Sequence, residues 1–215
     1  MFSRPLEEQN ITQHSADICF DTDVESETPN KIGKIEFTLI NRSRMMNGLD
    51  GDSSDNLFES CDAISHELMM MYSVLFDEEG EPTNPELEGL LEGDIMYLDS
   101  IVIEPRFRGM HLNRSPHVGY GIGLLAVDGL RGIFPSFEMD LVLLNPAASI
   151  AELEKYPGTS PEVAQKKLIA YWSLLGMNVW APSSSDFKLM GMWTGLRLPN
   201  IEEVWTGFSM FNVQF

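Results

Sequence analysis

The chain has little of three things that mark common classes of protein: cysteine, basic residues and long apolar runs. Its 215 residues include only two cysteines, Cys19 and Cys61, so the sequence implies no disulfide framework and a reducing compartment is the default. No window approaches the roughly 18 consecutive apolar residues that a membrane span needs. The start of the chain also lacks the apolar core of a signal peptide. We therefore expect a cytoplasmic protein that does not bind membranes.

Basic residues are scarce, because 14 of them stand against 33 acidic residues and give a net charge of −19. A broad basic surface for nucleic acid is therefore not expected. An acidic surface either attracts a cationic partner such as an amine, or simply keeps the protein soluble. The cysteines and histidines have no spacing typical of a zinc site, so no metal is expected.

What the chain does have is enough apolar residues, 43% of the total, to build the core of one domain over residues 1–215. Segment 1–30 is polar and acidic, and we expect part of it to be irregular. Apolar alternation and short apolar runs predict strands at 18–20, 34–40, 95–103 and 141–144, with one or two more in 187–215. Helical spacing predicts helices over 54–76, 123–134 and 161–175. This order of elements is typical of an α/β or α+β fold with a mixed sheet.

A glycine-rich turn, Gly121–Gly123, follows the strand predicted at 95–103 and opens a helix. Backbone N–H groups at a helix N-terminus attract phosphate, and glycines allow it to approach closely. Arg106, Arg108 and Arg114 lie nearby in the sequence and would add positive charge. The alternative is a tight turn between strand and helix that binds nothing.

Two blocks in this region, LDSIVIEPRFRGM and GIGLLAVDGL, resemble the acetyl-CoA-binding core of the GNAT N-acetyltransferase superfamily. The family pattern is a strand that ends in an apolar residue, then a proline, then Arg-x-x-Gly-x-Gly/Ala at the start of a helix. A later block, KKLIAYWSLLGM, is similar to the family's late helix, and the blocks with the strand between them span somewhat under half the chain. The resemblance implies a GNAT-type mixed, mostly antiparallel central sheet flanked by helices, with acetyl-CoA as the acyl donor.

The chain departs from the family pattern at residues 111–120, which interrupt the phosphate loop. Either Gly121 and Gly123 are the two loop glycines after a ten-residue excursion that covers the cofactor, or His111 replaces the first glycine and a side chain intrudes. We adopt the first interpretation, because only Gly121–Gly123 runs straight into the helix.

The resemblance also implies a set of cofactor-binding residues. Asn145 matches a position that often bonds the pantetheine arm, and its alternative role is that of a turn residue before Pro146. The full set that the resemblance implies is Ile101, Val102, Ile103, Arg108, Gly109, Met110, Gly121, Ile122, Gly123 and Asn145.

For catalysis, the resemblance points to residues four and six positions before Ile103, which are Asp99 and Tyr97. Asp99 is the candidate general base, acting directly or through water, and its alternative is a carboxylate bonded to a neighbouring loop. Where many family members carry a tyrosine as general acid, this chain has Trp172. The neighbouring Tyr171 points about 100° away on a helix, so it reaches the sulfur only if the helix is rotated, and otherwise it packs in the core.

These features together predict transfer of an acetyl or other acyl group from CoA to a small-molecule or peptide amine, which the acidic charge biases toward cations. The alternative is a GNAT-fold interaction or regulatory module that has lost catalysis. The sequence leaves a homodimer open.

Overall fold

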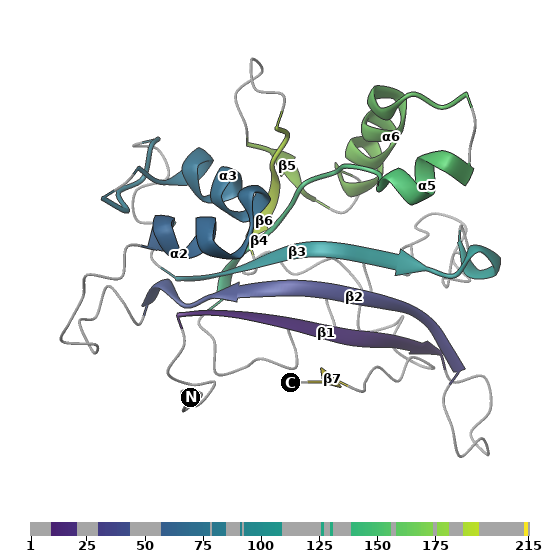
Figure 1. The fold of residues 1–215 in the computed structure, drawn as a ribbon, viewed down its shortest axis with the longest axis horizontal. Coiled ribbons are helices and arrows are strands. Elements are labelled where there is room, and N and C mark those ends of the chain that lie inside the picture. Colours follow the sequence, from purple (N-terminus) through teal and green to yellow (C-terminus); the bar gives the residue numbers. More distant parts are fainter. Residues whose placement is uncertain are drawn as a thin grey trace.

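The computed structural model describes residues 10–20, 30–43, 57–77, 79–84, 91, 93–108, 126, 130, 139–155, 158–173, 176–180, 187–193 and 213–214. The strands in these ranges form one seven-stranded sheet with the order β5-β6-β4-β3-β2-β1-β7 (Figure 1). β3 and β4 are parallel, and the other neighbouring pairs are antiparallel. The predicted class, a mixed and mostly antiparallel sheet with helices, is confirmed.

Three long strands form the middle of the sheet and shorter strands form its ends. The bounds are β1 Ile11–Phe20, β2 Asn30–Ile40, β3 Asp94–Ile103, β4 Met139–Leu144, β5 Asn178–Val179, β6 Met190–Trp193 and β7 Val213–Gln214. β1 is longer than the strand predicted at 18–20, because polar residues also face inward along it. Thr12 and His14 are both buried, with 2.8 Å between the Thr12 hydroxyl and His14 Nε2.

The helices are α2 Leu57–Ile64, α3 His66–Leu75, α5 Ile150–Lys155 and α6 Pro161–Ser173, with a 3₁₀ helix η3 at Pro105–Phe107. The prediction of one helix over 54–76 was wrong, because Ser65 interrupts it and separates α2 from α3. Ser65 adopts an extended conformation, and its hydroxyl accepts the Leu68 N–H at 3.0 Å, so it is the N-cap of a second helix. In the part of the chain that is described, no helix is long and apolar enough to cross a bilayer.

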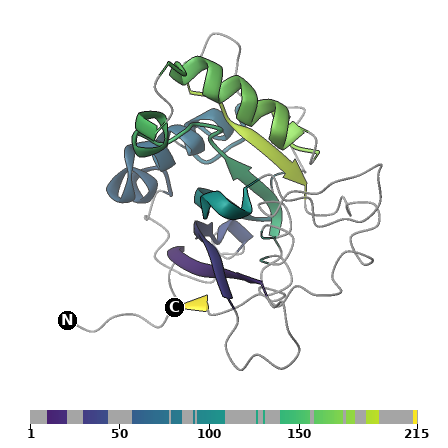
Figure 2. The same ribbon diagram turned by 90° about the vertical axis from the view of Figure 1, so that its right-hand side faces the viewer.

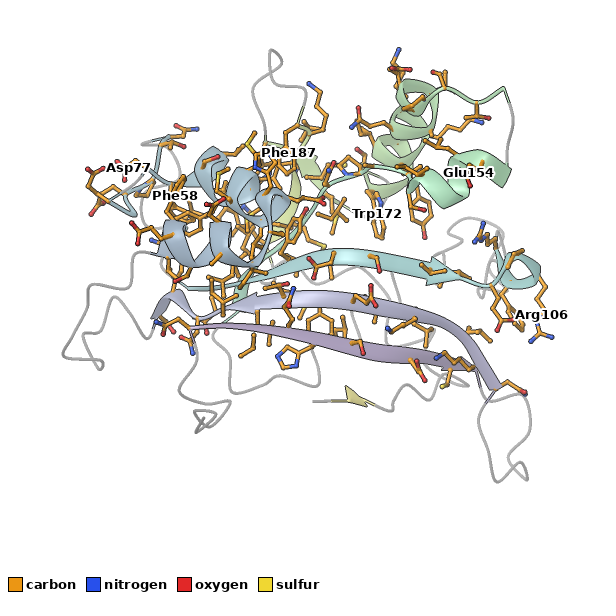
Figure 3. The ribbon with its side chains drawn as sticks, in the orientation of Figure 1. Phe58, Asp77, Arg106, Glu154, Trp172 and Phe187 are labelled. Atoms are coloured by element: carbon orange, nitrogen blue, oxygen red, sulfur yellow. The ribbon has the colours of Figure 1, made fainter. Side chains whose placement is uncertain are left out.

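Hydrophobic clusters cover both faces of the sheet. One face packs against Trp172 and Tyr171 of α6 and against Ala126 and Leu130, and Figure 3 shows Trp172 on the side of α6 that faces the sheet. The other face packs against α2 and α3. Figure 2 shows α5 and α6 beside β4 and β6, away from the end of the sheet where β1 and β7 lie.

At Gly33, β2 lies too close to the paired strand β3 for a side chain to fit without a shift. A Cβ atom at this position would lie 2.6 Å from the Val102 carbonyl oxygen and 3.0 Å from Ile103 Cδ1. We expect Gly33→Ala to lower the free energy of unfolding by about 1–3 kcal/mol, because a backbone group must move to admit the methyl group. Urea unfolding measures this, with the exposed Gln13→Ala as the control. Equal stability of both variants would contradict the close packing described here.

Candidate functional site

The feature that positions the site is a fork between the two parallel strands. β3 and β4 pair from Asp94 opposite Met139 to Leu98 opposite Leu144, where β4 ends. β3 continues to Ile103, paired with β2 alone among the described strands. Parallel neighbours require a crossover connection, and residues 126 and 130 within it are helical and buried. In open sheets, ligands bind where strands part beyond their carboxyl ends.

Beyond Leu98, the side of β3 that no described strand covers carries backbone groups that point into this fork. The Glu104 N–H donates to the Ile32 carbonyl at 2.9 Å, so the backbone groups of Glu104 face β2. Because backbone groups alternate sides along a strand, those of Ile101 and Ile103 point toward the β4 side. Arg108 Nε donates to the Ile103 carbonyl at 2.7 Å, which agrees with this direction. The N–H groups of Ile101 and Ile103 are therefore the donors that this edge offers to a bound carbonyl.

A β-bulge at Asp99 stands where the fork begins. Leu98 is opposite Phe37 and Ser100 is opposite Glu36, so Asp99 is an extra residue on β3. Thr38 is opposite Tyr97, and its hydroxyl donates to Asp99 Oδ2 at 2.9 Å. Asp99 and Tyr97 therefore lie on the same face, as the alternation predicts, and the bulge turns Asp99 toward solvent at the mouth of the fork.

The Asp99 carboxylate has an unusual affinity for protons. Its pKa is raised to about 6, chiefly by loss of hydration and then by the negative charges of Glu67 and Glu36, against the hydrogen bond from Thr38, which lowers it. The side chain is nevertheless exposed, so a solute can reach it. A carboxylate with these properties can accept a proton near neutral pH.

Tyr97 is 1% exposed, and its hydroxyl is hydrogen-bonded to Glu67, a residue that was not predicted from the sequence. It donates to Glu67 Oε1 on α3 at 2.7 Å, and Asn145 Nδ2 donates to the same oxygen at 3.1 Å. Burial first, and then the Glu67 carboxylate, raise the pKa of Tyr97 above its usual value. Tyr97 therefore acts here as a hydrogen-bond donor to Glu67. The one sequence signal for Glu67 is an acidic residue in the apolar helix HELMMMY.

Tyr171 lies on the opposite face of the sheet from Asp99. It packs against the cluster that contains Leu98, with Ile101 also at its edge. Its ring is 5.1 Å from that of Trp172, in an edge-to-face arrangement. The candidate acid and the candidate base thus flank β3 from its two sides.

The remaining predicted residues fall into two groups. Ile101 and Ile103 are partly buried against the core, whereas Val102 is 53% exposed on the face of Ser100. Arg106 pairs with Glu104 at 3.0 Å and points outward. The other predicted residues, Gly109, Met110, Gly121, Ile122 and Gly123, lie outside the described residues, as do Arg114 and 111–120.

The hydrogen bond from Thr38 predicts the direction in which the pKa of Asp99 changes when the Thr38 hydroxyl is removed. Thr38→Val removes a donor that favours the ionised carboxylate, so we expect the pKa of Asp99 to rise above its value of about 6. Carbon-13 NMR titration of the Asp99 carboxyl measures this. The matched control is Thr12→Val, which removes a buried hydroxyl whose partner is His14. A lower pKa in Thr38→Val would contradict the assigned contact.

A comparison with models of known protein families found no match, and a search of curated proteins found none either. Within the described ranges, no group of three or more histidine, cysteine, aspartate or glutamate side chains could hold a metal ion.

Proposed function

We propose that the protein is an acyltransferase of the GNAT type, which moves an acetyl or other acyl group from CoA to an amine by direct attack. The observation that carries this proposal is the fork, in which β4 ends at Leu144 while β3 continues to Ile103. Among the described strands none covers this edge of β3, and an edge of this kind can pair with an extended, amide-bearing chain such as pantetheine. The fork supports the proposal together with the sequence resemblance of 98–110 and 121–130.

The donor fits the described residues in two respects. The edge of β3 has backbone N–H groups at Ile101 and Ile103 that can donate to amide or thioester carbonyls, and a donor placed there stabilises the charge that develops on an attacked carbonyl. Arg108 lies at the far end of the same edge and is held there by the Ile103 carbonyl. When bound, acyl-CoA supplies an activated carbonyl with a thiolate leaving group.

Asp99 then accepts the proton that the amine must lose. The C–N bond forms as the C–S bond breaks, the amine proton passes to Asp99 directly or through water, and the sulfur leaves as thiolate. A carboxylate with a pKa of about 6 is ionised at neutral pH and still basic enough to assist. Tyr171, on the other side of β3, is the candidate donor of a proton to the thiolate.

The acceptor is a cationic amine on this proposal. The open face beside Asp99 carries Glu67 and Glu36, while the cation Lys34 on that face is already bonded to Glu36 at 2.6 Å. The net charge of −19 adds a long-range attraction for cations that salt weakens.

The test is an acyl-transfer assay with acetyl-CoA and a panel of amines of increasing positive charge, in which release of the CoA thiol is followed. We expect turnover that falls as salt is raised. A folded protein that releases no thiol with any amine would contradict the proposal, and a neutral amine that outperforms all cations would contradict the acceptor class.

A second candidate function is a regulatory or interaction module without catalysis, and Trp172 favours it. Trp172 stands on α6 where the resembling family often carries its acidic tyrosine, and an indole cannot protonate a thiolate. Calorimetric titration with acetyl-CoA separates the two functions, since the module predicts no binding and the enzyme predicts binding in the micromolar range.

A further inference from the structure

Glu67 connects three elements at the mouth of the fork. It lies in the first turn of α3, and its Oε1 atom receives both the Tyr97 hydroxyl at 2.7 Å and Asn145 Nδ2 at 3.1 Å. Tyr97 belongs to β3, and Asn145 is the first residue after β4. One carboxylate oxygen therefore joins α3 to both branches of the fork at the place where they part.

The bridge is firmly anchored on each side. Tyr97 is 1% exposed and pairs with Leu143 of β4 in the parallel ladder, so its ring has little freedom. α3 is fixed at its start by the Ser65 cap, two residues before Glu67. A carboxylate in the first turn of a helix is also favoured by the helix dipole.

Glu67 also acts on Asp99 through its charge. The charged and titratable groups that face Asp99 among the described residues are Glu67 on α3, Glu36 and Lys34 on β2, and Tyr97 on β3. Lys34 is bonded to Glu36 at 2.6 Å, so Glu67 is the carboxylate in this set without a cationic partner in the described part of the chain.

We propose that Glu67 is a positioning residue that holds Tyr97 and Asn145 at the mouth of the fork and thereby fixes the place of Asp99. The inference rests on the proposed function only in that Asp99 is the general base. The bridge itself is a property of the folded chain, and it is measurable without any substrate.

The test compares three variants of the full chain. Glu67→Gln keeps an oxygen that can accept both hydrogen bonds but removes the charge, whereas Glu67→Ala removes both. Glu154→Gln on α5 is the control, because it removes an exposed carboxylate of another helix (Figure 3), one that is not among the charges that shift the pKa of Asp99. The readouts are the pKa of Asp99 from carbon-13 NMR, amide hydrogen exchange at Leu98, Leu144 and Asn145, and acyl transfer.

In Glu67→Gln we expect the pKa of Asp99 to fall below its value of about 6 while exchange at the fork stays at the wild-type rate. In Glu67→Ala we expect the pKa to fall and exchange at the fork to accelerate on the order of tenfold, as for the loss of one partly buried and one exposed hydrogen bond. A purely structural role would speed exchange in Glu67→Ala without moving the pKa in Glu67→Gln.

The proposal is overturned if Glu67→Ala exchanges at the wild-type rate, or if Glu67→Gln leaves the pKa of Asp99 unchanged. Should Glu67→Ala fail to fold, the titration of Glu67→Gln still decides. A wild type that transfers no acyl group would refute the proposed function alone, because exchange and titration judge the bridge independently.

Discussion

Asp99→Asn is expected to reduce acyl transfer by about 10²- to 10⁴-fold, which is the usual contribution of a positioned general base. Asparagine has nearly the shape of aspartate and can still accept the Thr38 hydroxyl, so the loss reports the missing proton acceptor. The measurement is kcat/KM with acetyl-CoA and the best cationic amine. The matched control is Asp17→Asn, which removes a carboxylate of β1 that is paired with Lys31. A variant within threefold of the wild type would contradict the role of Asp99.

The pH dependence has a definite sign. Because the base must be ionised, the wild-type rate should rise as pH passes the Asp99 pKa of about 6, and this rise should vanish in Asp99→Asn. Stability should move the other way. The folded pKa lies above the unfolded value of about 3.9, so the folded chain binds more protons between these values and loses stability as pH rises through that window. Asp99→Asn removes this loss, so it should be no less stable than the wild type at neutral pH.

Arg42→Met is expected to lower the free energy of unfolding by about 2–5 kcal/mol, the range for a buried polar network that loses its donor. Arg42 is 3% exposed, its guanidinium donates to the carbonyls of Leu91 and, at 3.0 Å, Gly80, and it lies 3.7 Å from the ring centre of Phe76. Methionine keeps most of the apolar volume but leaves the buried Leu91 carbonyl and the partly buried Gly80 carbonyl without this donor. Urea unfolding measures the loss.

Two variants sharpen this second prediction. Arg106→Met removes an exposed arginine whose partner is Glu104, and should change stability by less than about 1 kcal/mol. Arg42→Lys keeps the charge but lacks the planar fork that reaches two carbonyls and stacks on Phe76, so it should recover only part of the loss. If Arg42→Met were as stable as Arg106→Met, the hydrogen bonds of Arg42 would not contribute to the free energy of unfolding, which would contradict the prediction.

The sequence predicted the parts of the fold that depend on local periodicity. The alternation of β2, the apolar run of β4 and the Pro161 start of α6 are all seen in the structure. Ser65 was missed as a helix break because the apolar spacing of Ile64, Leu68 and Met71 continues through it.

The candidate site was predicted only in part, for a physical reason. Asp99 and Tyr97 follow from strand alternation, but their partners depend on contacts across long stretches of chain. Thr38 reaches Asp99 over 61 positions and Glu67 reaches Tyr97 over 30, and neither separation leaves a mark in local sequence. The fork itself arises from unequal strand lengths, since β4 ends at Leu144 while β3 runs on to Ile103.

Binding of acetyl-CoA at the fork is the central claim, and amide NMR tests it most directly. The N–H groups of Ile101 and Ile103 point into the fork, whereas that of Val102 faces β2. We therefore expect titration of the folded protein with acetyl-CoA to shift the amide resonances of Ile101 and Ile103 more than that of Val102. Free CoA should shift the Arg108 resonance while acting less on Asp99. Unchanged resonances from Asp99 to Arg108 at saturating acetyl-CoA, in a protein whose other resonances show a native fold, would contradict the account.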